Sequence, residues 1–173
     1  MALLNACGRG VVSQLERHRK LFLYGKEVQE RRSVGFFSDE SAGYKYSKKT
    51  VVPNPLTPEL KNLLTYVNSK LNSKFNGILV NYYESGDEYI SKHSDDEKGL
   101  DPSAGVVALN LGSSRIFRIR DKKTKKIVLD VRTRDNEMLQ MAGKDFQKNF
   151  THEIPKQKGA GWRISFTFRY HQE

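Results

Sequence analysis

An imidazole and a carboxylate lie two residues apart at His93 and Asp95. In an extended strand this spacing places both side chains on the same face. A second imidazole on a neighbouring strand, for which His152 is the natural candidate, would complete a set of two histidines and one carboxylate. Such a set binds a ferrous ion on one face and leaves other positions open for a substrate and for oxygen. Because His-x-Asp is a common pattern, the prediction of a metal site depends on the rest of the chain.

A second group of polar side chains lies near the C-terminus, where polar and apolar residues alternate. The alternation predicts a strand with one polar face, made of Arg163, Ser165, Thr167 and Arg169. A guanidinium group binds a carboxylate through two parallel hydrogen bonds, so a dicarboxylate ligand would give both arginines a partner. Without such a ligand, two buried arginines on one strand would be costly. Asn81 and Tyr83 likewise share one face of a strand, just before the segment that contains His93.

One helix and a series of short strands must position these residues. Thr57 is a candidate N-cap, Pro58 suits the first helical position, and leucine and valine recur at helical spacing as far as Leu71. Strands are predicted at 21–24, 77–83, 106–109, 115–120, 127–131, 137–141 and 162–170, and an aromatic, polar loop at 35–55. Many short strands after a single helix indicate a mostly β (α+β) chain, for which a jelly roll fits best.

The length of 173 residues predicts a single domain, 1–173, with an N-terminal extension at about 1–55 and a core at about 56–173. Cys7 is the only cysteine, and the sequence contains no signal peptide and no apolar run long enough to span a membrane. We therefore expect an intracellular monomer with no membrane partner. The net charge of +10 favours a polyanionic partner, nucleic acid ahead of membrane.

The order of these motifs resembles that of the AlkB family, whose members are Fe(II)- and 2-oxoglutarate-dependent dioxygenases that remove alkyl groups from nucleobases. The matching positions are Asn81-x-Tyr83, His93-x-Asp95, the distant His152, and Arg163-x5-Arg169. Residues 82–87 resemble the family's Asn-Arg-Tyr-x-x-Gly turn, 93–97 its His-x-Asp-Asp-Glu, and 152–156 its His-x-(Val/Leu)-Pro segment. Residues 31–47 resemble its nucleotide-recognition lid, which ends in Tyr-x-Tyr-Ser. The likeness extends over about residues 20–170.

The resemblance implies a role for each matching residue. His93, Asp95 and His152 would be the catalytic iron ligands. The residues that would hold 2-oxoglutarate are Asn81, Tyr83, Arg163, Thr167 and Arg169. The residues that would bind the substrate are Phe36, Phe37, Tyr44 and Tyr46, which stack on the base or close the pocket, and Asp96 and Glu97, which face the base.

The resemblance also implies a reaction. With Fe(II) as cofactor and 2-oxoglutarate and O2 as co-substrates, a base of the 1-methyladenine or 3-methylcytosine type in DNA or RNA would be demethylated. The products would be formaldehyde, succinate and CO2, and the base would have to be flipped out or already single-stranded. The sequence departs from the family at 35–39, where Gly-Phe-Phe-Ser-Asp stands in place of Trp-Tyr-Gly-Asp.

Two other functions are compatible with parts of the sequence. One is a 2-oxoglutarate oxygenase that acts on an RNA modification, a protein or a small molecule, against which the net charge and the lid argue. The other is a non-catalytic jelly-roll module that binds nucleic acid, against which the complete set of ligands argues. The remaining histidines, His18 and His171, are predicted to be surface residues.

Overall fold

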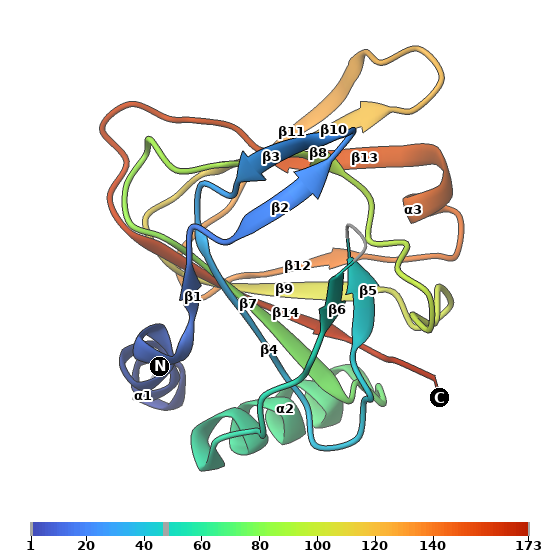
Figure 1. The fold of residues 1–173 in the computed structure, drawn as a ribbon. Helices are drawn as coiled ribbons and strands as arrows, with labels where there is room; N and C mark the ends of the chain where they lie inside the picture. Colours follow the sequence, from blue (N-terminus) through green and yellow to red (C-terminus); the bar gives the residue numbers. More distant parts are fainter. Residues whose placement is uncertain (1, 47–48, 173) are drawn as a thin grey trace.

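The computed structural model describes residues 2–46 and 49–172, with side chains described for all of these except 2–4, 46 and 49. Two antiparallel sheets form the body of the protein (Figure 1). The larger has six strands in the order β1 (Glu16–Arg17), β4 (Ser33–Phe37), β7 (Gly77–Tyr83), β14 (Arg163–Arg169), β9 (Val106–Gly112) and β12 (Met138–Met141). The smaller has four in the order β11 (Ile127–Arg132), β10 (Ile116–Asp121), β13 (Phe150–Ile154) and β8 (Ile90–His93). The prediction of a mostly β chain with a jelly-roll core is confirmed.

Among the described residues, two hairpins and four helical segments complete the fold (Figure 1). The hairpins join β2 (Lys20–Leu23) to β3 (Lys26–Gln29), and β5 (Tyr44–Tyr46) to β6 (Lys49–Val51). The helical segments are α1 (Ala2–Val11), the 3-10 turn η1 (Val12–Gln14), α2 (Pro58–Leu71) and the short α3 (Phe146–Asn149). Within the described ranges 2–46 and 49–172, no helix has the length and apolar character that a membrane span requires.

The helix α2 forms as its sequence predicts. Thr57 caps it by accepting a hydrogen bond from the backbone N–H of Leu60 at 3.2 Å, and Pro58 occupies the first turn. Asn72 ends it in the left-handed conformation, with φ of 49°. Leu60 and its neighbours on the same stripe pack against the larger sheet, so this helix covers one face of that sheet.

The alternation along β14 decides which side chains reach the space between the sheets. Ile164, Phe166 and Phe168 belong to the hydrophobic core beneath α1 and α2. The polar residues of the strand therefore face the opposite way, toward the smaller sheet. Between the sheets a second, smaller apolar cluster contains Val106 of the larger sheet and Phe117 of the smaller one. The cavity described below lies beside this cluster.

The prediction of a loop at 35–55 is wrong at its beginning and in its middle. Residues 33–37 form β4, which pairs with β7 so that Phe36 lies opposite Leu79 and Phe37 opposite Ile78. Residues 44–46 and 49–51 form the hairpin β5–β6. The segment Ser-Val-Gly-Phe-Phe lacks a polar and apolar alternation because β4 is largely buried on both faces, which hides the period of a strand.

Candidate active site

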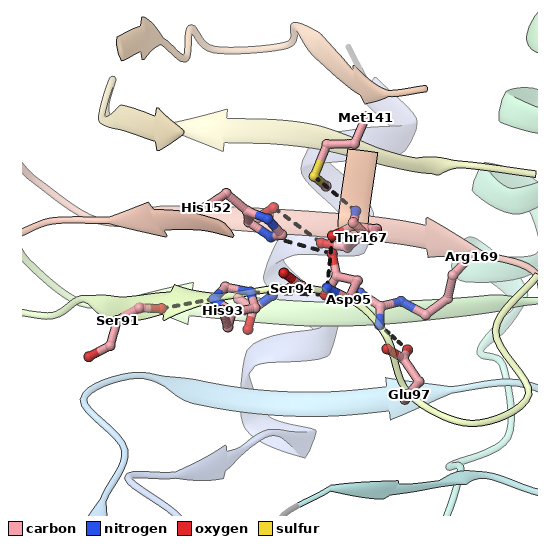
Figure 2. Close-up of polar contacts among 12 residues, drawn as sticks. Ser91, His93, Ser94, Asp95, Glu97, Met141, His152, Thr167 and Arg169 are labelled. Atoms are coloured by element: carbon pink, nitrogen blue, oxygen red, sulfur yellow. Dashed lines mark hydrogen bonds and ion pairs between the residues drawn. The ribbon is translucent and has the colours of Figure 1, made fainter. Parts of the chain in front are cut away.

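The antiparallel pairing of β8 with β13 brings the two predicted histidine ligands together. His93, the last residue of β8, lies directly opposite His152 of β13, and the centres of their rings are 4.2 Å apart. The chain then leaves β8, and Asp95 is held at this point through its backbone N–H, which donates to Oε1 of Gln147 at 2.9 Å. The hydroxyl of Ser94 donates to the carbonyl of Phe150 at 2.7 Å. These two bonds fix the loop to α3 and to the first residue of β13 (Figure 2).

The carboxylate of Asp95 points at both imidazoles. Its oxygens lie 3.9 Å from Nε2 of His93 and 3.4 Å from Nε2 of His152, and one ligand atom from each of the three residues lies within 4.8 Å of the others. Nδ1 of His93 donates to the carbonyl of Ser91 at 2.8 Å, which leaves Nε2 with its lone pair available (Figure 2). This donor set fits a ferrous ion.

Burial and charge keep these groups in the forms that bind a metal. Burial, together with the neighbouring His152, lowers the pKa of His93 to about 3, so this imidazole is neutral at physiological pH. Burial alone would raise the pKa of Asp95, but Arg169 and then His152 outweigh it and hold that pKa below its usual range. A neutral imidazole and an ionised carboxylate can bind a divalent cation without first losing a proton.

Arg163 is a buried cation with unused hydrogen-bond donors. It is 2% exposed, its Nη2 donates to Oδ1 of Asn110, and its guanidinium lies 5.4 Å from the centre of the Tyr83 ring. Its Nε and Nη1 have no hydrogen-bond partner within residues 2–46 and 49–172. Burial lowers its pKa to about 10, which still leaves it charged at neutral pH. An unpaired buried charge is costly, so this group fits a carboxylate ligand.

Arg169, on the same face of the same strand, is already paired. Its guanidinium donates to Glu97, and its Nη2 lies 3.4 Å from Oδ1 of Asp95 (Figure 2). Burial lowers the pKa of Arg169, but the two carboxylates outweigh burial and raise it. Because it contacts Asp95, Arg169 can orient that side chain toward the metal position.

A cavity of about 340 Å³ connects these groups. Its lining contains most of the residues predicted to bind metal, 2-oxoglutarate or substrate: Tyr44, Asn81, Tyr83, His93, Asp95, Asp96, Glu97, His152, Arg163, Thr167 and Arg169. Phe36 and Phe37 are not among the described residues that line it. Both are fully buried, Phe37 in the core beneath the helices and Phe36 against Tyr44, so their predicted place in a lid is corrected to packing within the larger sheet. The side chain of Tyr46 lies outside the described residues.

The sequence pattern of the 2OG-Fe(II) oxygenase superfamily matches residues 3–169. The chain is also similar to mouse "DNA oxidative demethylase ALKBH2", with 29% identity over 157 residues, 87% of this chain and 66% of that protein. The chain belongs to the AlkB family of that superfamily. The mouse "Alpha-ketoglutarate-dependent dioxygenase alkB homolog 3" is 31% identical over 140 residues, 73% of this chain and 47% of that protein. This AlkB-family chain therefore spans less than two thirds of the length of these curated relatives.

A solved structure titled "The structure of OsALKBH1" has the same fold. It superposes with a TM-score of 0.58 over 97% of this chain and 90% of that chain, at 18% sequence identity. This likeness concerns the fold alone, and it agrees with the jelly roll seen in this AlkB-family member.

Several polar residues of the site in this AlkB-family chain were not predicted from the sequence. Asn110 accepts the hydrogen bond from Arg163, and Arg32 donates to Oδ1 of Asn81 at 2.8 Å. An amide within the apolar run of β9 was a signal for Asn110, because a buried amide needs a partner. The prediction that His171 lies at the surface is wrong: it is 5% exposed and contacts Glu97.

Proposed function

We propose that this protein is an Fe(II)- and 2-oxoglutarate-dependent oxygenase that demethylates alkylated bases in DNA or RNA. The observation that carries the proposal is that one cavity contains both the His93, Asp95 and His152 set and the guanidinium of Arg163, whose Nε and Nη1 have no hydrogen-bond partner among the described residues. A metal-binding face and a carboxylate-binding cation are the two requirements of a 2-oxoglutarate oxygenase. One of the two mouse relatives is named a DNA oxidative demethylase and the other an alpha-ketoglutarate-dependent dioxygenase, which supports the proposal.

Bound Fe(II), with O2 and 2-oxoglutarate, would supply the oxidising chemistry. The balanced reaction consumes one 2-oxoglutarate and one O2 for each N-methyl group, and yields succinate, CO2, formaldehyde and the unmodified base. In this cavity His93, Asp95 and His152 would hold the metal. Arg163, with Asn110 and Tyr83 beside it, would bind a carboxylate of the co-substrate and fix its orientation.

Other polar groups in the cavity wall suit the rest of the co-substrate. The hydroxyl of Thr167 lies on the same face of β14 as Arg163, and its Oγ1 is 3.5 Å from Oγ of Ser165. Asn81 lies on the neighbouring strand β7, opposite Ser165, with its Oδ1 already accepting from Arg32. Its amide N–H groups remain available to donate to a bound acid.

The residues at the edge of the cavity suit a methylated, positively charged base. Asp96 is exposed and lines the cavity, so its carboxylate is available to a cationic ring. Tyr44 lines the cavity, and burial raises its pKa to about 12, so its hydroxyl stays protonated and can donate a hydrogen bond. Glu97, by contrast, is engaged by Arg169 and His171. We therefore assign contact with the base to Tyr44 and Asp96.

A second hollow of about 410 Å³ adjoins the cavity and shares residues 95–97 with it. Its lining also contains Lys122, Lys144 and Lys148. Three cations in a hollow that shares residues with the candidate metal site suit the phosphates next to a target nucleotide. This feature and the net charge of +10 favour nucleic acid over a protein or a small-molecule substrate.

The experiment that tests the proposal measures 2-oxoglutarate decarboxylation and formaldehyde release together. The protein is reconstituted anaerobically with Fe(II), and oxygen is admitted with oligonucleotides that carry 1-methyladenine or 3-methylcytosine, in DNA and in RNA. Unmethylated oligonucleotides of the same sequence are the matched control. We expect both products to rise together with a methylated strand only, and to be lost in His93→Ala. Equal decarboxylation with and without the methyl group would contradict the proposal.

A further inference from the structure

A buried chain of polar contacts joins the segment before β5 to the metal ligand Asp95. Oγ of Ser41 lies 2.9 Å from Nδ1 of His171, and Nε2 of His171 lies 3.3 Å from Oε1 of Glu97. The same carboxylate accepts from Arg169, whose Nη2 is 3.4 Å from Oδ1 of Asp95. The last two contacts are seen in Figure 2. All five side chains are buried, so water does not compete for these bonds.

The two neighbours of His171 determine where its proton lies. Oγ of Ser41 accepts from the backbone N–H of Gly43 at 3.0 Å, so its own hydroxyl proton is available for Nδ1 of His171. Nε2 faces a carboxylate oxygen, which can only accept, so Nε2 carries a proton and donates it to Glu97. Both ring nitrogens are thus used. The ring itself packs against Phe36 and Tyr44, with centroid distances of 5.2 and 5.4 Å.

The backbone of His171 is also fixed. Its N–H donates to Oδ1 of Asn76 at 2.9 Å, and Nδ2 of Asn76 donates to its carbonyl at 2.8 Å. On either side of His171, the N–H of Asp101 donates to the carbonyl of Tyr170, and the N–H of Gln172 donates to the carbonyl of Gly99. The C-terminal residues 170–172 therefore hold the loop that follows Asp95 and Glu97. A histidine in such a place can act on that loop without touching the cavity.

We propose that His171 is a positioning residue that holds Glu97 in its ion pair with Arg169. In this way His171 controls how strongly Arg169 attracts the carboxylate of the metal ligand Asp95. The proposal rests on the assignment of Asp95 as a metal ligand in the proposed function. With Glu97 in place, Arg169 divides its charge between two carboxylates. When Glu97 is released, the whole charge acts on Asp95, which weakens that carboxylate as a donor to a cation. The same histidine ties Ser41, and with it the segment that leads to Tyr44, to the metal ligand.

Two substitutions separate the contact of His171 with Glu97 from its contact with Ser41. The amide of His171→Gln reaches the position of Nε2, so this variant retains the donor to Glu97 and loses the bond to Ser41. The amide of His171→Asn reaches the position of Nδ1, so it retains the bond to Ser41 and loses Glu97. Affinity for Co(II), titrated through its visible absorption, should fall about tenfold in His171→Asn, the size of one hydrogen bond to a charged group, and stay within threefold in His171→Gln. Amide hydrogen exchange at 41–43 should accelerate in His171→Gln and not in His171→Asn.

A matched control is available in His18, which also contacts a glutamate, Glu88; among the described residues Glu97 belongs to the cavity lining and Glu88 does not. His18→Asn should leave the Co(II) affinity unchanged. Ser41→Ala, which removes only a hydroxyl, should repeat the exchange result of His171→Gln. The proposal is overturned if both His171 variants bind Co(II) like the wild type, or if both weaken it equally. These measurements use no nucleic acid, so they stand even if methylated oligonucleotides fail to stimulate turnover.

Discussion

Replacing Arg163 with methionine should have opposite effects on co-substrate binding and on stability. The guanidinium is buried beside Tyr83 and donates to Asn110, while Nε and Nη1 have no partner within the described residues. Methionine fills a similar volume without a charge. In the ligand-free protein, Arg163→Met removes an incompletely paired buried cation, so the free energy of unfolding should stay within about 1 kcal/mol of the wild type or rise. Binding of 2-oxoglutarate should be nearly abolished.

The size of the binding loss follows from the two unpaired donors of Arg163. A hydrogen bond to a charged group contributes about 1.5–3 kcal/mol, so two such bonds contribute about 3–6 kcal/mol. Since each 1.4 kcal/mol is a factor of ten, the Kd for 2-oxoglutarate should rise between about 100-fold and 10,000-fold. Calorimetric titration of the Mn(II)-loaded protein without oxygen measures this directly. Arg163→Lys keeps a charge but not the paired donors, and should fall between the wild type and the methionine variant.

Arg115 provides the matched control for Arg163. It is fully buried with its guanidinium 5.5 Å from the centre of the same tyrosine ring, but its Nη atoms donate to the carbonyls of Ser85, Glu88 and Pro155. Arg115→Met leaves these carbonyls without their donor and should lower the free energy of unfolding by at least about 3 kcal/mol. Its effect on 2-oxoglutarate binding by the folded protein should be small. If Arg163→Met kept its affinity within threefold, or if both variants lost stability alike, Arg163 would be a structural residue.

Three further predictions concern the metal, the proton and the nucleic acid. Mn(II) at 100 times its Kd should stabilise the protein by about 2.7 kcal/mol and raise Tm by about 5–10 °C, an increase that His152→Ala should lack. In the metal-free folded protein, burial lowers the pKa of His93 to about 3, against 6.5 for an ordinary histidine. As the pH falls, the unfolded chain therefore binds this proton at a higher pH than the folded protein does. The contribution of this group to the free energy of unfolding is complete above pH 6.5 and falls with decreasing pH until about pH 3. Urea unfolding at several pH values should show that the free energy of unfolding of His93→Asn depends less on pH than that of the wild type. Lys144→Gln with Lys148→Gln should reduce the salt slope of oligonucleotide binding by about two, whereas Lys70→Gln on α2 should leave it unchanged. These predictions would be contradicted by a metal effect that survives His152→Ala, by a pH dependence of stability in His93→Asn equal to that of the wild type, or by a reduction of the salt slope in Lys70→Gln as large as in the double lysine variant.

The sequence predicted those elements of the fold that bury one face only. The alternation of β14 and the apolar stripe of α2 were readable because each element has one polar and one apolar side. β4 was missed because its residues are buried on both faces. β8, with the sequence Ile-Ser-Lys-His, was missed because its main apolar contribution is one residue and its pairing with β13 decides its conformation. Such elements depend on partners that are distant in the chain.

Spacing in the sequence located the side chains of the site but not their contacts. The two-residue spacing of His93 and Asp95 predicted that their side chains lie close together, and the structure brings both together with His152. It could not show that Glu97 pairs with Arg169, because that contact is made across 72 residues. Nor could it show that His171, which follows the last strand, is buried, because the loop that covers it comes from residues 97–101.

The two arginines on one face of β14 illustrate the same limit and lead to different roles. Sequence reasoning treated Arg163 and Arg169 as equivalent because they share a face and a residue type. Arg169 lies beside two carboxylates, so its charge is already compensated. Arg163 has an amide and an aromatic ring as neighbours, so no carboxylate compensates its charge among the described residues. Since a dianionic co-substrate gains most where a cation is uncompensated, we infer that Arg163 provides most of the affinity for a carboxylate, and that Arg169 sets the donor strength of Asp95.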